Sequence, residues 1–374
     1  MTEVIMAPKG LAGVVVEDTI LSRVDGVKGE LTYLGYNVDE LVSCSFEEII
    51  HLFLYGSLPT RGQLEELNAK LVAARTIPES VQNYVAQAPA DHPMATLRSG
   101  ISMLSGYLTD PEDLSDASLK DDAIALISKT ATVAAAIARV RAGKPLVTPR
   151  EDLSHAANFL YMCNGEVPED IVTDTMNLAL ILHADHSFNA STFTARVVAS
   201  TQSDMVSAIC AAVGSLKGPL HGGANTAVMK TLMEIGELDN VESWLDTALT
   251  EKRKIMGFGH RVYRVFDPRA RHLKAMSEEW GKRVGNVKWF EMSARLEQLM
   301  LDKKNINPNV DFYSASTYYA MGIDPDMYTP IFAVSRVLGW SAHVVEQLSD
   351  NRIFRPKANY VGGEGKKLVA IEDR

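Results

Sequence analysis

A histidine lies between two glycine-bearing pairs in the stretch GPLHGGAN, residues 218–225. The Gly-Pro pair ends a long apolar helical run, and a new helical period begins after the two following glycines, so His221 is predicted at a helix N-terminus. The helix dipole there disfavours the imidazolium, so we expect a neutral ring that donates a hydrogen bond to an oxygen on which negative charge develops. The glycines leave space for a ligand. A helix-start histidine without a chemical role is the alternative.

A second candidate site is the stretch GFGHRVYRVFDPR, residues 257–269. His260 follows a flexible Gly-Phe-Gly turn, and the basic residues around it disfavour its protonation while leaving it able to donate a hydrogen bond. Arg269 follows an Asp-Pro turn at a predicted helix start, a position suited to gripping a carboxylate with its planar fork. The alternative is a basic surface loop without a ligand.

Three further charged residues lie in places where chemistry is possible. Asp311, in PNVDFYS, opens a predicted helix, where it is either an N-cap or a general base facing a site. Arg336 lies inside an apolar helix and needs a partner there, which is either a structural carboxylate or an anionic ligand. Arg355 follows that helix in Phe-Arg-Pro.

Helical periodicity dominates the elements that must position these residues. Residues 1–36 are predicted to be irregular, with short extended pieces and an Asp25-Gly26 turn. Capping boxes at 45–48 and 60–63 open two helices, the first of which ends at Gly56. Further helices are predicted over about 79–88, 93–107, 118–142, 151–163, 168–187, 190–200, 203–216, 222–236, 241–253, 269–284, 287–304, 311–321 and 327–348. The pattern is that of an all-α protein, with short strands expected only near the two ends of the chain.

Composition narrows the function classes. The chain has 374 residues, 46% of them apolar, which suffices for a large core. Its three scattered cysteines do not suggest disulfides and favour the cytoplasm, and no signal peptide or membrane span is predicted. The net charge of −10 argues against nucleic-acid binding, yet residues 252–274 hold eight Lys or Arg and one acid. That cationic segment is either a solvated face or a site for a polyanionic small molecule.

Motifs of other enzyme classes are missing. Gly257-Phe-Gly259 lacks the third glycine of a dinucleotide fingerprint, and no phosphate-binding P-loop, nucleophile elbow or His-Glu-x-x-His zinc helix is found. His183 and His186 are spaced to share one helical face, but no further Cys or His lies near them to complete a metal site. Among the reaction types considered, this leaves chemistry that side chains perform without a metal or a bound cofactor.

The motifs taken together, and in this order, resemble citrate synthase, in particular the short bacterial and archaeal members of the family. The resemblance runs from Gly10 to Pro356 and rests on residues 182–200, 215–225, 256–270, 308–314, 332–340 and 355–362. It implies an all-α fold and the condensation of acetyl-CoA with oxaloacetate and water to citrate and CoA. No permanently bound cofactor is implied, since coenzyme A enters as the acyl-CoA substrate.

The resemblance also implies a role for each candidate residue. Asp311 would take a proton from the acetyl methyl group, neutral His221 would stabilise the enolate oxygen, and His260 would polarise the oxaloacetate carbonyl. The oxaloacetate ligands would be His186, Arg269, Arg336 and Arg355. The coenzyme A ligands would be Lys254, Ile255, Met256, Gly257, Phe258 and Arg264.

Domain organisation and assembly are implied in the same way. Residues 1–221 and 327–374 would form a large domain, and 222–326 a small domain that closes over substrate. The family is dimeric, with the arginine matching Arg355 reaching the partner's site. Leu34 and Lys357 stand where many relatives have arginine. The chain lacks the extra N-terminal region of hexameric, NADH-inhibited relatives, so we expect a dimer without that regulation.

Three other functions compete with this interpretation. 2-Methylcitrate synthase shares the catalytic residues but uses propionyl-CoA, and one methylene in an apolar pocket discriminates by only about 1–3 kcal/mol. A non-catalytic helical protein that binds CoA esters would have no need of the carboxylate at Asp311. A nucleic-acid adaptor using residues 252–274 is disfavoured by the overall acidity.

Overall fold

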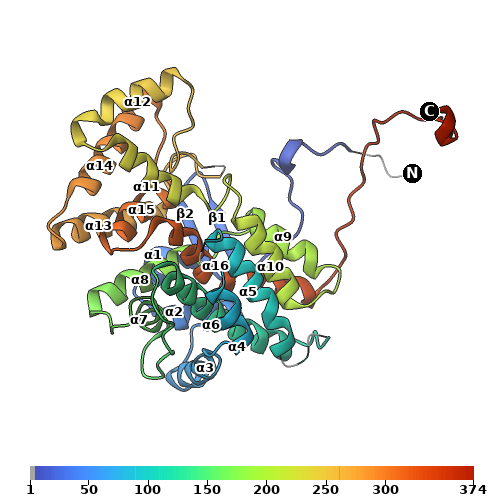
Figure 1. Cartoon of the computed structure of the whole chain (residues 1–374), viewed down its shortest axis with the longest axis horizontal. Helices are drawn as coiled ribbons and strands as arrows, with labels where there is room; N and C mark the ends of the chain where they lie inside the picture. The colour runs from blue at the N-terminus through green and yellow to red at the C-terminus, as the bar shows by residue number, and fades with distance from the viewer. Residues whose placement is uncertain (1–4, 89, 109, 111, 261) are drawn as a thin grey trace.

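The computed structural model describes residues 5–88, 90–108, 110, 112–260 and 262–374, which form a mostly α-helical fold (Figure 1). The expected all-α class is therefore confirmed. The α-helices are α1 (Val38–Leu41), α2 (Phe46–Tyr55), α3 (Arg61–Ala73), α4 (Glu79–Ala86), α5 (Pro93–Ser102), α6 (Asp116–Arg141), α7 (His155–Asn164), α8 (Asp170–His183), α9 (Ala190–Ala199), α10 (Met205–Leu216), α11 (Ala224–Ile235), α12 (Val241–Thr250), α13 (Pro268–Arg283), α14 (Lys288–Lys304), α15 (Val310–Ala320) and α16 (Tyr328–Ser349). Short 3₁₀ turns lie at Lys9–Leu11, Met103–Tyr107, Leu238–Asn240, Pro325–Met327 and Ile371–Asp373.

The strands lie near the N-terminus, as expected. Strands β1 (Ser22–Asp25), β2 (Glu30–Tyr33) and β3 (Tyr36–Asn37) form an antiparallel sheet in chain order. The turn between β1 and β2 follows Asp25, whose carboxylate accepts the backbone N–H groups of Val27 and Lys28. The strand pieces expected near the C-terminus are not found, because residues 350–370 are irregular and largely exposed. They have no neighbouring strand to pair with.

Local capping chemistry defines the first long helices. Ser45 and Glu48 form a reciprocal capping box at α2, and Gly56 ends that helix in the left-handed region with φ of 80°. Thr60 and Gln63 form the same box at α3. Both boxes satisfy backbone N–H groups that a helix start leaves unpaired, so these boundaries follow from short-range sequence alone.

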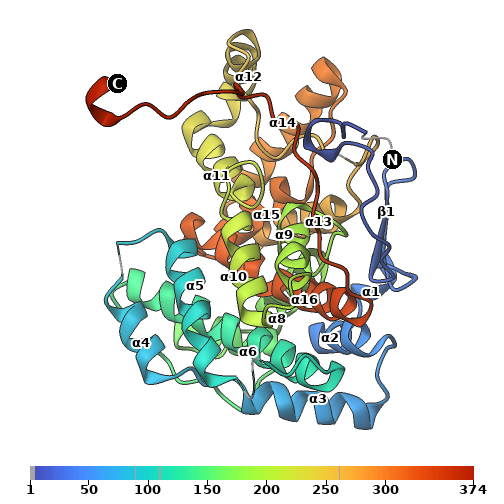
Figure 2. The same cartoon turned by 90° about the vertical axis from the view of Figure 1, so that its right-hand side faces the viewer.

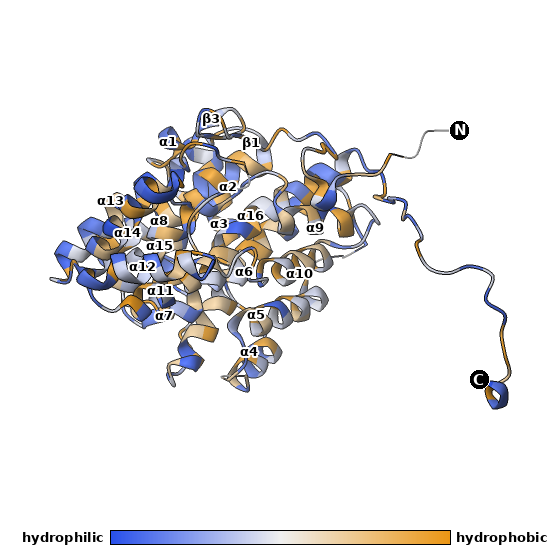
Figure 3. Cartoon of the chain, turned by 90° about the horizontal axis from the view of Figure 1, so that it is seen from above, coloured by the Kyte–Doolittle hydropathy of each residue, from blue (hydrophilic) through white to orange (hydrophobic). Residues whose placement is uncertain are grey.

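Two long helices form the centre of the core. Helices α6 and α16 pack against each other, and most of their residues are buried. They are drawn largely in white and orange in Figure 3, whereas α12–α14 carry much more blue. By length and composition alone, α6 could cross a membrane, but 78% of its apolar window is buried inside the protein. That burial is typical of a core helix.

The helices gather into two groups. Helices α11–α15 lie together at one end of the molecule, and α2–α8 lie at the other, with α16 between them (Figures 1 and 2). Beyond α16 the chain leaves the body as an extended arm (Figure 2). Apart from Arg355, the candidate site residues lie in the turn after α8, in the loops before α11 and α13, in the first turns of α13 and α15, and on α16.

Candidate active site

His260 is held in one orientation by the backbone that follows it. Its Nδ1 accepts hydrogen bonds from the N–H groups of Val262 and Tyr263, at 3.0 and 3.2 Å. An accepting ring nitrogen carries no proton, so we assign the proton of the neutral ring to Nε2. Burial, and then the charge of Arg269, lowers the pKa of His260 to about 4. The ring is therefore a neutral hydrogen-bond donor at physiological pH.

His186 lies beside His260, but not on a helix. The prediction of a helix over 168–187 is wrong at its end, because α8 stops at His183. His183 and His186 therefore do not share a helical face. The ring of His186 lies edge-on to His260, with centroids 5.0 Å apart, and its Nε2 is 3.3 Å from the hydroxyl of Tyr263. Burial, then Arg269, lowers its pKa well below the usual value, so this ring is also neutral.

Arg269 is buried and already has a counter-ion. It is the second residue of α13, and its guanidinium makes a two-point contact with Asp267, through Nε at 2.9 Å and Nη2 at 2.8 Å. Asp267 also caps α13 and accepts the N–H of Val310 at 3.1 Å. This carboxylate thus fixes Arg269 and ties the start of α13 to the start of α15, next to Asp311.

Arg336 is a second buried arginine among the candidate residues, and its environment differs from that of Arg269. It is 1% exposed on α16, its Nε donates to the carbonyl of His183 at 2.6 Å, and it lies over the ring of Phe332. Within the described part of the chain, no carboxylate lies within ion-pair distance of it. Burial lowers its pKa to about 10. A buried charge without a counter-ion is unfavourable, so this position favours an anionic ligand over a structural salt bridge.

Asp311 lies at a junction between a loop and a helix, as predicted, but it is not the cap. Asn309 caps α15 by accepting the N–H of Asp311 at 3.1 Å, which leaves the Asp311 carboxylate free of that task. Its Oδ1 is buried and has no hydrogen-bond partner among the described residues. Burial raises the pKa of Asp311 to about 7, against the opposing charge of Arg269. Such a carboxyl group is suited to general-base chemistry.

His221 lies three residues before α11, at the helix start where it was expected. Burial, and then the charge of Arg336, lowers its pKa to about 4. This low pKa agrees with the predicted neutral ring, and burial is its main cause.

Ser191 orients the His221 ring. The hydroxyl of Ser191 lies 2.8 Å from His221 Nε2 and accepts the indole N–H of Trp340 at 3.0 Å. The single proton of the Ser191 hydroxyl has two acceptors at 2.8 Å, His221 Nε2 and the side-chain oxygen of Asn189. Because that Asn189 oxygen already accepts two backbone N–H groups, we assign the hydroxyl proton to the contact with His221. We therefore assign the proton of the neutral imidazole to Nδ1, where it is available for donation to a ligand.

The predicted coenzyme segment, residues 254–258, is pinned to the loop that carries Asp311. Asn309 N donates to Gly257 O at 2.9 Å, and Gly259 N donates to Asn307 O at 3.0 Å. Gly257 has φ of 81°, and a Cβ there would lie 2.6 Å from Val228 and 2.8 Å from Phe312. Only glycine fits this position, so the segment and the loop before α15 form one unit.

The charge of the cationic segment, residues 252–274, is partly neutralised by ion pairs with acids inside and outside it. Four of its eight basic residues form ion pairs: Arg253 with Glu234, Arg269 with Asp267, Arg271 with Asp39 and Lys274 with Glu297. Lys254 and Arg264 are exposed, as a ligand for phosphates must be, and the N–H of Arg264 is held by the carbonyl of Gly26 at 2.8 Å. Arg261 lies outside the described residues.

Arg355 is not brought to this site within the single chain. It lies in the exposed segment after α16, where its guanidinium contacts the carbonyl of Pro356. The described residues contain no group of three or more His, Cys, Asp and Glu that could hold a metal ion.

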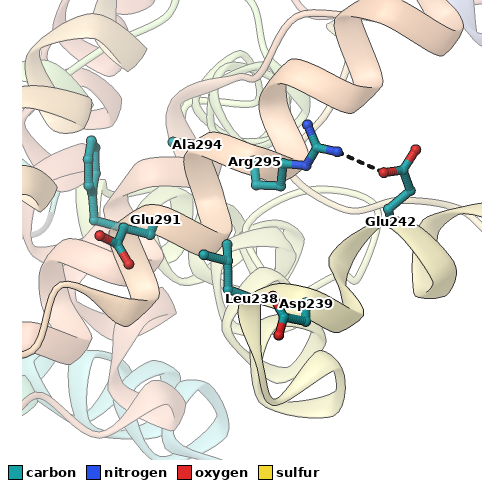
Figure 4. A pocket seen from close by; sticks show the side chains of 7 residues that line it. Leu238, Asp239, Glu242, Glu291, Ala294 and Arg295 are labelled. Carbon is teal, nitrogen blue, oxygen red and sulfur yellow. Dashed lines mark hydrogen bonds and ion pairs between the residues drawn. The ribbon is translucent and has the colours of Figure 1, made fainter.

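Two surface cavities lie elsewhere. One of about 610 Å³ lies between residues 238–242 and α14 (Figure 4), and one of about 640 Å³ lies among α2, α8 and α13. Neither is lined by a predicted site residue.

Three residues with clear contacts at the site were not singled out from the sequence. Asp267 had a signal, since an Asp-Pro pair before a helix marks an N-cap, but its pairing with Arg269 depends on the fold. Ser191 and Tyr263 had none, because each meets its histidine partner through tertiary packing rather than through a local motif.

Comparison with known proteins places the chain in a family. A family model described as "Citrate synthase, C-terminal domain" matches residues 10–357. Citrate synthase 2 of Bacillus subtilis (strain 168) is 48% identical over 371 residues, covering 98% of this chain and 99% of that protein. The 2-methylcitrate synthase of Mycobacterium tuberculosis (strain H37Rv) is 43% identical over 362 residues, covering 96% and 92%. The solved ternary complex of citrate synthase from Thermoplasma acidophilum with carboxymethyl coenzyme A and oxaloacetate has a TM-score of 0.93 at 35% identity, covering 98% of this chain and 99% of that one. The chain belongs to the citrate synthase family.

Proposed function

We propose that this protein condenses acetyl-CoA with oxaloacetate and water to give citrate and CoA. The observation that carries the proposal is the buried Arg336, which has no carboxylate partner among the described residues and lies beside neutral histidines and an unpartnered carboxyl group. A dicarboxylate such as oxaloacetate would supply the missing negative charge, with Arg269, Arg336 and His186 as its ligands in this chain. The bound oxaloacetate and coenzyme A analogue of the Thermoplasma relative support this choice of substrates.

The chemistry then divides among three side chains. Asp311 takes a proton from the methyl carbon of acetyl-CoA, while His221 donates a hydrogen bond to the thioester oxygen that gains charge. The resulting carbon nucleophile attacks the ketone carbon of oxaloacetate, and His260 transfers its Nε2 proton to the ketone oxygen, which becomes the alcohol. Water then adds to the thioester carbon of citryl-CoA, the carbon–sulfur bond breaks, and CoA leaves as its thiol.

The acyl group is the open choice, because relatives of both kinds match the chain over nearly its whole length. We favour acetyl-CoA, with propionyl-CoA and 2-methylcitrate as the alternative. The test is release of CoA thiol from acetyl-CoA and propionyl-CoA, each with and without oxaloacetate. Faster oxaloacetate-dependent release from acetyl-CoA supports citrate synthesis, preference for propionyl-CoA assigns 2-methylcitrate synthesis, and no release from either overturns both.

Assembly and closure are part of the proposal. The grouping of α11–α15 at one end supports a small domain over 222–326 that closes on the large domain, residues 1–221 and 327–374 (Figure 1). The exposed Arg355 is free to reach a partner's site in a homodimer. Measurement of the mass in solution tests this, and a hexamer contradicts it. We place the protein in the cytoplasm, which the three unpaired cysteines favour.

Removal of the Ser191 hydroxyl is expected to slow enolisation. In Ser191→Ala, the ring of His221 loses the donor that keeps its proton on Nδ1, so we expect kcat to fall about 10- to 100-fold with little change in the KM for oxaloacetate. Steady-state kinetics check this. The matched control is Ser128→Ala, in which Ser128 of α6 loses a buried hydrogen bond to the carbonyl of Leu71 in α3. Equal kcat values for the Ser191 variant and the wild type contradict the assigned tautomer.

The rate should fall with pH below neutrality. A base must be ionised to act, and the pKa of Asp311 is raised to about 7, so kcat/KM for acetyl-CoA is expected to fall about tenfold per pH unit below 7. His221 and His260, with pKa values of about 4, stay neutral throughout and add no inflection between pH 5.5 and 9. A profile that stays level down to pH 5.5 excludes a base with this pKa.

A further inference from the structure

Asp185, the residue before His186, carries a fully buried carboxylate in the turn between α8 and α9. Its Oδ2 accepts three hydrogen bonds: from the hydroxyl of Ser22 at 2.5 Å, from the N–H of Ser187 at 3.0 Å and from Nε2 of His343 at 3.3 Å. These donors come from β1, the turn itself and α16. Burial alone would raise the pKa of Asp185, but His343 and the other donors hold it below its usual value. One charge thus joins three segments of the chain.

The backbone on both sides of His186 depends on these contacts. Ser187 has φ of 50°, a left-handed conformation that is unfavourable for a residue with a side chain. Its N–H is held by Asp185 Oδ2 and by the Ser22 hydroxyl, at 3.0 and 2.9 Å. On the other side, the carbonyl of Asp185 accepts a hydrogen bond from the hydroxyl of Tyr33 at 3.2 Å. The peptide groups that flank His186 are therefore both anchored by side chains from elsewhere.

Helix α16 closes the arrangement from behind. A Cβ on Gly339 would lie 2.6 Å from Asp185 Oδ1 and 2.4 Å from the carbonyl of Ala184, so the helix backbone contacts the turn directly. The backbone of α16 therefore prevents the turn at Ala184 and Asp185 from moving toward the helix. The ring of His186 is thereby directed at His260 and Tyr263.

His343 connects this turn to a second pair of charges. Its Nδ1 lies 3.2 Å from Nη1 of Arg196 and 3.6 Å from Glu346. Arg196 pairs with Glu346, which also accepts the N–H of Ile20 at 2.8 Å, just before β1. The same network therefore holds the N-terminal strand, with Ser22, against α16.

We infer that Asp185 is a positioning residue for His186: held by Ser22 and His343, its carboxylate fixes the strained turn that presents the imidazole to substrate. The inference rests on the proposed function, in which His186 binds oxaloacetate. Asp185 acts only on the backbone that places His186. Its loss should therefore weaken the binding of oxaloacetate and leave acyl-CoA binding and the chemical step unchanged.

The first test is Ser22→Ala, which removes the hydroxyl that contacts both Asp185 and Ser187 and spares the buried charge. Because a displaced His186 would hydrogen-bond oxaloacetate less well, the variant is expected to raise the KM for oxaloacetate about tenfold. The KM for acetyl-CoA and kcat should stay within about threefold. Ser128→Ala is the matched control for loss of a buried serine hydrogen bond, and thermal unfolding checks that each variant is folded.

A second pair of variants separates positioning from packing. His343→Gln keeps an N–H group where Nε2 reaches Asp185, whereas His343→Leu fills similar volume without a donor. We expect the glutamine variant to retain the wild-type KM for oxaloacetate within about threefold and the leucine variant to match Ser22→Ala. Equal KM values for the wild type and folded Ser22→Ala overturn the inference, as do equal values for the two His343 variants.

Oxaloacetate binding, measured by calorimetry without acyl-CoA, distinguishes the two levels of the proposal. If the wild type binds oxaloacetate and Ser22→Ala binds it equally well, the positioning role is wrong while the proposed function stands. If the wild type neither binds oxaloacetate nor releases CoA thiol in its presence, the proposed function fails and the inference fails with it. If the wild type binds oxaloacetate and Ser22→Ala binds it more weakly, both the proposed function and the positioning role are supported.

Discussion

Asp311→Asn is expected to lose nearly all turnover while keeping its fold. The amide cannot accept a proton from the acetyl methyl group, and loss of a general base typically costs about 10²–10⁴-fold, so we expect kcat to fall by about 10³-fold. The measurement is release of CoA thiol from acetyl-CoA with saturating oxaloacetate. A protein that only binds CoA esters has no turnover to lose, and its affinity would be indifferent to this change.

The same variant is expected to be more stable than the wild type above neutral pH. The folded-state pKa of Asp311 is raised to about 7 from 3.8, so the folded protein binds this proton more tightly than the unfolded chain. Stability is therefore lost as pH rises from about 4 to 7, and the loss is complete above 7. Its upper limit is about 4 kcal/mol, and partial exposure of Asp311 reduces it to about 1–3 kcal/mol.

Urea unfolding at pH 5 and pH 8 measures this effect, since the advantage of the variant should be larger at pH 8. Asp170→Asn is the matched control, because Asp170 is an exposed acid in the first turn of α8. It should change neither turnover nor the pH dependence of stability. If Asp311→Asn retains more than about a tenth of the wild-type kcat, Asp311 is not the base.

His221→Ala is expected to have the second largest effect. It removes the donor aimed at the thioester oxygen, and loss of one such donor lowers kcat by about 10²–10³-fold. Because the hydrogen bond strengthens as charge develops, the KM for acetyl-CoA should change much less than kcat. Steady-state kinetics measure both constants. Exchange of the acetyl methyl protons with deuterated water reports enolisation directly and should slow in parallel.

Two comparisons make the His221 result specific. His92→Ala removes a histidine that caps α5, outside the site, and should affect stability but not turnover. Ser191→Ala leaves the imidazole in place and should show a smaller loss of kcat than His221→Ala. If enolisation proceeds at the wild-type rate in His221→Ala, another group stabilises the enolate oxygen.

Features that depend on neighbours in the chain followed from the sequence. The capping boxes of α2 and α3 and the helix start after His221 are local, because each uses backbone groups within one turn. The all-α class was predicted for the same reason, since helical periodicity is read within single segments. The family resemblance, carried by short motifs in order, was confirmed by comparison over nearly the whole chain.

Tertiary structure decided the properties that make these residues chemically competent. The end of α8 at His183, which frees His186 from the helix, depends on contacts of the turn with β1 and α16. The partner of Arg269 and the lack of one for Arg336 among the described residues are likewise set by packing.

The protonation states of the site residues were also decided by tertiary structure. Burial, far more than sequence neighbours, lowers the pKa of His221 and His260 and raises that of Asp311. Burial is the sum of contacts between segments distant in sequence. The sequence by itself thus determined which groups could do the chemistry and on which elements they lie. Only the fold determined their charge at neutral pH, because the removal of water from a side chain requires the whole protein.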